Sequence, residues 1–267
     1  MTAEHPTTRD GARTSGGATT PRMWAPRQHG AWAMLLLPLL VGISASRFDA
    51  WQVVLAGAAA SGYLASATAQ TWRRARNREK YRLSLLVFGV TFAGLSLALV
   101  ATHPALLLTL TVLLPAAAVA VLLSRPGRPR SVAEGLAQVA QALVLVPASA
   151  YLAGPLDVPR VALATLTAGL YLVGTVLTVR SVIRERGNLR FVALSGGYHV
   201  VAAVAALLLL PIAYAALFAA LAARALALPM IERHLADTPR PLRPIQVGMV
   251  EMLASACLIG ICLAVPL

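Results

Sequence analysis

Charged residues are scarce in this sequence. They make up 12% of its 267 residues, whereas soluble domains carry about twice that share. Hydrophobic residues reach 58%, which is more than a soluble core requires, and the mean hydropathy is +0.72. The scarcity of charge therefore excludes a globular cytosolic enzyme, and the composition predicts an all-α, polytopic membrane bundle.

Cysteine and short catalytic motifs are also nearly absent. Cys257 and Cys262 are the only cysteines, and both lie in one apolar segment, which excludes a disulfide scaffold. Their spacing of five places them on different helix faces and fits no metal-ligand pattern. The sequence contains no P-loop, nucleophile elbow or Gly-rich dinucleotide fingerprint. We therefore expect neither a metal ion nor a nucleotide cofactor.

What is present is a series of nine apolar stretches, each near the length that spans a bilayer. Residues 1–22 are rich in Thr, Gly and Ser and predict a disordered cytoplasmic tail, followed by a transmembrane domain over 23–267. Pro104 and Pro211 mark two of the joins between helices, because proline breaks or kinks a membrane helix. The predicted helices cover 30–46, 51–71, 83–101, 104–123, 134–153, 160–180, 191–210, 211–229 and 245–266.

The positive charges alternate between loops as a membrane topology requires. With nine spans, 21 of the 23 Lys and Arg residues fall on one side, Arg224 among them, and only Arg47 and Arg160 fall on the other. The positive-inside rule then predicts a plasma-membrane protein with a cytoplasmic N-terminus and an extracytoplasmic C-terminus. Topology and anionic headgroups account for most of the net charge of +13. We therefore expect membrane lipids as partners, and no nucleic acid.

Two basic clusters on the cytoplasmic side repeat one pattern. Residues 74–80 and 180–186 both read R-x-x-x-R-E-[KR], 106 residues apart. Arginines four apart share a helix face and repel one another, and the adjacent glutamates are expected to face elsewhere. Chance in an Arg-rich chain explains the match about as well as a function does. The functional interpretation is a pseudo-twofold bundle whose clusters converge on one anionic group, with these ligand residues: Arg74, Arg78, Glu79, Arg180, Arg184 and Glu185.

Polar residues inside the predicted helices are functional candidates, because lipid makes them costly. Glu251 is interpreted as an ion-pair partner of an arginine at the cytoplasmic end, as a protonated group in a hydrogen bond, or as a catalytic acid or base. His199 is either a hydrogen-bonded structural residue or a catalytic group. Gln138 and Gln141, three apart on one helix, either line a polar cavity or join helices. His29 opens the first helix, where it is placed to bind a headgroup.

Three segments resemble the YwiC-like family, a bacterial family of multi-pass membrane proteins. They are PRQHGAWAM at 26–34, VRSVIRERGN at 179–188 and RPIQVGMVE at 243–251. The resemblance covers essentially the whole chain after residue 22. It implies a multi-pass membrane protein and assigns no biochemical activity.

The helix count and the two clusters are also similar to the layout of the UbiA superfamily of intramembrane prenyltransferases. That resemblance implies nine helices, a cytoplasmic N-terminus and active-site motifs at the cytoplasmic ends of the second and sixth helices. The superfamily holds Mg²⁺ with Asp-rich motifs, but arginines with one glutamate each stand here instead. No Mg²⁺ cofactor is therefore expected, and arginine forks would bind phosphate directly.

Three functions remain open at this point. The first is a degenerate UbiA-like transferase that acts on an isoprenoid or other anionic lipid through a basic pocket. The second is a transporter or non-catalytic binder of an anionic solute or lipid. The third is an accessory protein whose basic face docks on anionic lipid or on a partner.

Overall fold

The computed structural model describes residues 29–123, 131–235 and 243–267, so the predicted tail at 1–22 lies outside its described part. The described residues form helices and no strand, which confirms the all-α fold. In chain order the elements are α1 (His29–Ser44), α2 (Ala50–Arg74), α3 (Glu79–Thr102), the 3₁₀ helix η2 (Pro104–Thr109), α4 (Leu110–Leu123), α5 (Val132–Leu143), α6 (Leu145–Leu152), α7 (Val158–Ile183), α8 (Leu189–Leu209), α9 (Ile212–Leu235) and α10 (Pro244–Ala264).

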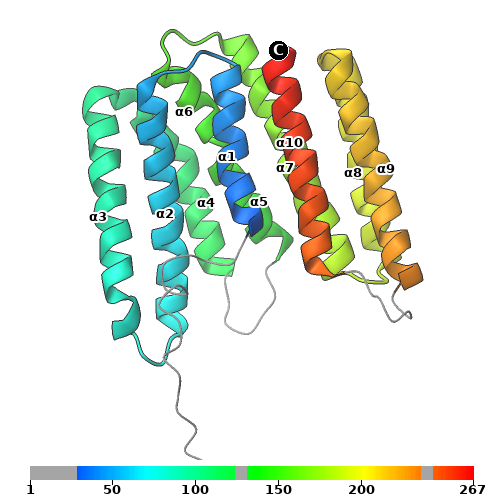
Figure 1. Cartoon of the computed structure of the whole chain (residues 1–267), viewed down its shortest axis with the longest axis horizontal. Helices are drawn as coiled ribbons and strands as arrows, with labels where there is room; N and C mark the ends of the chain where they lie inside the picture. Colours follow the sequence, from blue (N-terminus) through cyan, green and yellow to red (C-terminus); the bar gives the residue numbers. More distant parts are fainter. Residues whose placement is uncertain (1–28, 124–130, 236–242) are drawn as a thin grey trace, which may run out of the picture.

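Within the described residues these elements form nine rods that run up and down one bundle (Figure 1). Two of the rods are composite, because η2 continues into α4 and only Val144 separates α5 from α6. Seven rods are long and apolar enough to cross a membrane, namely all those from α3 to α10. The prediction of a polytopic membrane bundle is thereby confirmed.

The first two rods differ from the other seven in length or composition. α1 has only 16 residues, and α2 has 25 residues but is less apolar. The polar side chains of Gln52, Ser61 and Thr68 on α2 are buried, so they face the protein and not lipid. α2 lies between α1 and α3 in the bundle (Figure 1), where protein partners replace the lipid contacts that an isolated span would make.

Proline explains both the confirmed joins and the differences from the predicted boundaries. The predicted breaks near Pro104 and Pro211 are present, but the predicted helix at 134–153 is divided before Pro147, whose ring displaces the carbonyl of Leu143. α9 continues past Pro229 to Leu235, although we predicted its end at 229, because membrane helices tolerate proline.

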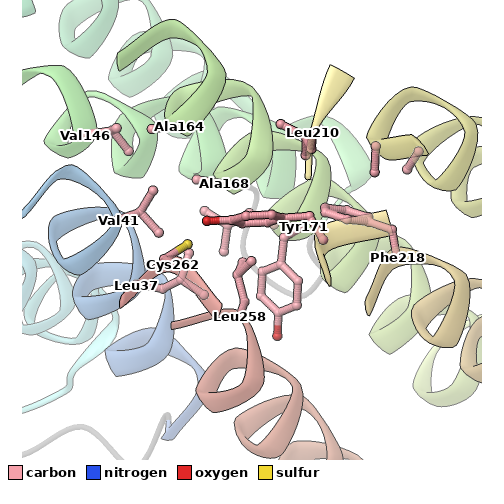
Figure 2. Packing of buried hydrophobic residues seen from close by; sticks show 14 of the residues in the cluster. Leu37, Val41, Val146, Ala164, Ala168, Tyr171, Leu210, Phe218, Leu258 and Cys262 are labelled. Atoms are coloured by element: carbon pink, nitrogen blue, oxygen red, sulfur yellow. The ribbon is translucent and has the colours of Figure 1, made fainter. Parts of the chain in front are cut away.

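α7 is the central helix of the bundle. It packs against α1, α5, α6, α8, α9 and α10. Figure 2 shows its Ala168 and Tyr171 among Leu37 of α1 and Leu258 of α10, all of them buried. At the periphery, α3 and α4 leave most of their apolar side chains exposed, as helices that face lipid do.

The two arginines expected on the extracytoplasmic side hold helix ends. Nε of Arg47 donates to the carbonyl of Ala153 after α6 at 2.9 Å, and Nη2 of Arg160 donates to the carbonyl of Ser44 at the end of α1 at 3.3 Å. These last carbonyls of a helix have no partner within the helix itself. The two arginines therefore stabilise helix C-termini.

Candidate intramembrane site

Polar side chains from four helices meet inside the bundle, and we call them the intramembrane polar cluster. On α7 they follow the spacing i, i+4, i+7, so they share one helix face. Neighbouring helices α8, α9 and α10 supply the rest. The cluster consists of Tyr171, Thr175, Thr178, His199, Arg224, Glu251 and Ser255.

The centre of the cluster is an ion pair between Arg224 and Glu251. Nη1 of Arg224 lies 2.8 Å from Oε1 of Glu251, and the two side chains are only 12% and 9% exposed. The contact lacks the alignment of a hydrogen bond, and Nε of Arg224 has no hydrogen-bond partner in the described part of the chain. The guanidinium is thus held by charge at Nη1, while its Nε donor stays unused.

Both members of the pair lie far from the helix ends. Glu251 is seven residues into α10, about 10 Å at 1.5 Å per residue, and Arg224 is eleven residues before the end of α9, about 16 Å. We had assigned Arg224 to the cytoplasmic side, and the longer α9 corrects that assignment. Glu251 therefore pairs with an arginine in the interior of a helix and not with one at the predicted cytoplasmic end.

Three hydroxyl groups fix the position of Glu251. Thr175 donates from Oγ1 to Oε2 of the carboxylate at 3.0 Å. The Tyr171 hydroxyl donates to the backbone carbonyl of Glu251 at 3.1 Å, and Ser255 donates to the same carbonyl at 2.9 Å. The bonds from Thr175 and Tyr171 hold α10 onto α7, and the bond from Ser255 lies within α10, so the carboxylate has a defined place beside Arg224.

The structure gives His199 a structural environment. Its Nδ1 lies 2.7 Å from the carbonyl of Ser195, which only accepts, so Nδ1 must carry the proton. In the neutral ring Nε2 then accepts from the Thr178 hydroxyl at 3.2 Å. Gly174 makes room for the ring, because a Cβ there would lie 2.8 Å from Nε2. Both nitrogens are engaged, which favours the hydrogen-bonded interpretation of His199 over the catalytic one.

The basic cluster after α7 is partly neutralised by its own glutamate. Arg180 donates to Oε1 of Glu185 from Nε at 3.2 Å and from Nη2 at 3.0 Å, so Glu185 faces Arg180, contrary to our expectation. The hydrogen bond from Asn188, followed by that from Arg180, holds the pKa of Glu185 below its ordinary value. Arg184 ends α7 as its C-cap. Gly187, with φ of 75°, then turns the chain toward α8.

The basic cluster after α2 is more open. Arg78 precedes α3, and its guanidinium lies 5.2 Å from the ring centre of Trp72. Glu79 pairs with Arg82 at 3.4 Å, and both side chains are exposed to solvent. The side chains of Arg74 and His29 lie outside the described part of the structure. The turns that carry the two clusters lie at the same end of the bundle but on opposite sides of it (Figure 1), so the structure does not bring them together.

The two glutamines of α5 are half-buried. Among the described residues neither Gln138 nor Gln141 makes a side-chain hydrogen bond, and no bond joins them to the intramembrane polar cluster. The described residues also contain no group of three or more His, Cys, Asp or Glu that would suit a metal ion.

An open apolar groove of about 610 Å³ lies on the other face of α7, between α5, α6 and α8. It is separate from the polar cluster, because Leu166, Gly169 and Val173 occupy the face of α7 opposite Tyr171 and Thr175. Arg180 lies seven residues beyond Val173, on the groove face and about 10 Å farther along the helix.

Sequence inspection missed the partner of Glu251, although a signal was present. Arg224 interrupts a run of apolar residues and lies five residues before even the shorter predicted end of its helix. The polar residues Tyr171, Thr175 and Thr178 likewise recur at helical spacing within an apolar stretch. A polar stripe on one helix and single charges on two others predict a shared interior site.

Comparison with known proteins agrees with the first of the two resemblances. The family described as YwiC-like protein matches residues 25–151. The protein of Bacillus subtilis (strain 168) that is named "Uncharacterized protein YwiC" is 30% identical over 175 residues, which are 65% of this chain and 73% of that protein. No solved structure matches the chain. The resemblance to the UbiA superfamily stays a prediction.

Proposed function

Because the chain belongs to the YwiC-like family and is a multi-pass membrane protein, we propose that it binds a lipid-soluble anion inside the bilayer, as the binding step of a carrier. The ligand carries a carboxylate or a phosphate. Arg224 binds this group, and Glu251 occupies the same guanidinium when no ligand is present. The observation that carries the proposal is the buried Arg224, whose N–H donors are only partly used.

Physical chemistry supports a ligand role for this arginine. A charged side chain within the hydrocarbon is costly, and such residues mark substrate and ion pathways in membrane proteins. A guanidinium presents five donors in a fork that matches carboxylate and phosphate. Glu251 contacts Nη1 at 2.8 Å, and Nε has no hydrogen-bond partner in the described part of the chain. The Nε donor gives an incoming anion a hydrogen bond that the resident carboxylate does not make.

The test is to identify the anions that copurify with the protein in mild detergent, using native mass spectrometry. Wild type is compared with an Arg224→Gln/Glu251→Gln variant, in which the interior stays neutral and polar. Arg233→Gln is the matched control, because Arg233 is an exposed residue on the same helix, nine positions away. We expect an anionic molecule bound to wild type and to Arg233→Gln, and absent from the double variant. The same set of bound molecules in all three proteins would overturn the proposal.

A second candidate function is the binding of an anionic lipid or isoprenoid, with or without UbiA-like group transfer. The groove would bind the hydrocarbon chain of the lipid, and Arg180 would bind its headgroup. The apolar groove favours this candidate, since its 610 Å³ lies in the range of small-ligand sites and Arg180 follows on the same helix face. In this case Arg180→Gln should remove a bound lipid that Arg224→Gln/Glu251→Gln retains. The two candidates therefore predict opposite patterns in one experiment.

A further inference from the structure

The inference concerns the charge balance of the Arg224–Glu251 pair, and it rests on the function proposed above. As one cation and one anion in contact, the two side chains together add no net charge to the membrane interior. An anion that takes the guanidinium of Arg224 leaves Glu251 without its counter-charge. A buried carboxylate that loses its partner is strongly destabilising.

No other cation in the described interior replaces Arg224. Helix α10 packs against α1, α7 and α9. α1 has no titratable side chain from Trp32 to Ser44, α7 presents the neutral Tyr171, and the nearby His199 of α8 uses both ring nitrogens. The other titratable side chains that the structure describes on α1, α7, α9 and α10 lie near helix ends or in the C-terminal half of α10: Arg160, Arg180, Tyr214, Glu232, Arg233, His234, Cys257 and Cys262.

We infer that each anion bound at Arg224 is accompanied by one proton, which Glu251 takes up. The proton comes from the aqueous phase and adds to a carboxylate oxygen of Glu251. Arg224 keeps its charge and exchanges one anionic partner for another, and no electrons move. The protein is therefore a proton-coupled carrier in which a monovalent anion and a proton enter together.

The immediate surroundings of Glu251 suit both protonation states. A hydroxyl both donates and accepts, so Thr175 donates to the carboxylate in the observed state and accepts from the carboxylic acid after protonation. Tyr171 and Ser255 bind the backbone carbonyl of residue 251 and not its side chain. The helix turn therefore stays in place while the side chain changes charge.

The experiment measures how binding depends on pH. Purified full-length protein is equilibrated with total lipid extract of the expression host in one arm and with acetate in the other, and bound anions are counted by native mass spectrometry. If one proton is taken up, the wild-type affinity falls about tenfold per pH unit where Glu251 is ionised in the free protein. Glu251→Gln imitates the protonated state, so its affinity should stay constant with pH. Binding in the lipid-extract arm identifies the ligand as a lipid, and binding in the acetate arm identifies it as a free carboxylate.

A second measurement uses wild type alone, so the test does not depend on the folding of a variant. A pH indicator in weak buffer should report one proton taken up per anion bound. Binding without proton uptake, with wild type as constant in pH as Glu251→Gln, would overturn the coupling and leave the proposed function intact. Binding that is absent, or that persists in Arg224→Gln/Glu251→Gln, would overturn both.

Discussion

At the scale of single residues, the Arg224–Glu251 ion pair determines how a substitution at either position changes the stability of the protein. Arg224 and Glu251 lie at a depth where a lone charge is costly, and each side chain offsets the charge of the other. Their energetics follow from what remains after a substitution. A single substitution leaves a buried charge, whereas a double substitution leaves none.

This difference predicts a non-additive response in stability. Glu251→Leu alone should lower the free energy of unfolding by about 3–5 kcal/mol, because Arg224 then stays buried and unpaired. Arg224→Leu/Glu251→Leu should recover most of that loss. Unfolding of the detergent-solubilised protein by a denaturing detergent measures both values. If the loss in Arg224→Leu/Glu251→Leu equalled the sum of the losses in Arg224→Leu and Glu251→Leu measured singly, the pair would not interact.

A second prediction at this scale concerns the room left for His199. In Gly174→Ala the new Cβ would meet Nε2 at 2.8 Å, so the ring must move and lose its bond to Thr178. We expect a loss of about 1–3 kcal/mol in the free energy of unfolding, typical of overpacking. The matched control is Gly197→Ala on α8, where a Cβ meets nothing within 4 Å. Equal stabilities of the two variants would contradict the assignment of a packing role to Gly174.

At the scale of elements, the turn between α7 and α8 is held by charge. Asn188 and Arg180 hold the pKa of Glu185 below its ordinary value. A carboxyl group with a lowered pKa stabilises the folded state above its ordinary pKa, about 4.3 for glutamate. That stabilisation is lost as the pH falls through the lowered folded-state value.

Glu185→Gln should therefore unfold at a lower temperature than wild type at neutral pH, and the difference should shrink as the pH falls below the ordinary pKa of glutamate and through the lowered folded-state value. Thermal unfolding at both pH values checks this, with Glu79→Gln as a control, since the side chain of Glu79 is 84% exposed. A difference that grows as the pH falls would have the wrong sign for this account.

The N-terminal end of α2 depends on the buried side-chain amide of Gln52. Its Nε2 donates to the carbonyls of Arg47 and Ser149, and its Oε1 accepts from the backbone of Asp49, which caps α2. Gln52→Leu removes these three hydrogen bonds and leaves the carbonyl of Arg47 only a 3.3 Å bond from the hydroxyl of Ser46, so we expect a cost of about 1–3 kcal/mol. The control Gln70→Leu, at an exposed position of the same helix, should leave the unfolding temperature nearly unchanged.

At the scale of the whole molecule, the odd number of rods in the described bundle places its two ends on opposite faces. The arginine distribution predicts that the turn at Gly187 is cytoplasmic and that Leu267 is extracytoplasmic. Alkaline phosphatase fused after Leu267 should be active, and green fluorescent protein inserted at Gly187 should fluoresce. Active phosphatase at Gly187 would reverse the predicted orientation in the plasma membrane.

The sequence predicted the rods well because lipid imposes a local rule. Each spanning helix must satisfy its own backbone and present apolar side chains, so its length and composition appear in one continuous segment. The partner of Glu251 follows no such rule. Arg224 lies 27 residues away on another helix, and only packing brings the two together. The two basic clusters differ in their contacts although their sequences are similar. Arg180 of one cluster is paired with Glu185, whereas Arg78 of the other lies over the ring of Trp72.

The polar composition of α2 has a consequence for how the chain is made. A helix that carries Gln52, Ser61 and Thr68 toward its neighbours gains less from lipid than the helices that follow it. During synthesis it would leave the translocon slowly if it were alone. We expect its release into the bilayer once α3 has emerged, because α3 is strongly apolar and packs along α2. We therefore expect α2 to integrate into the membrane together with α3, as a helical hairpin.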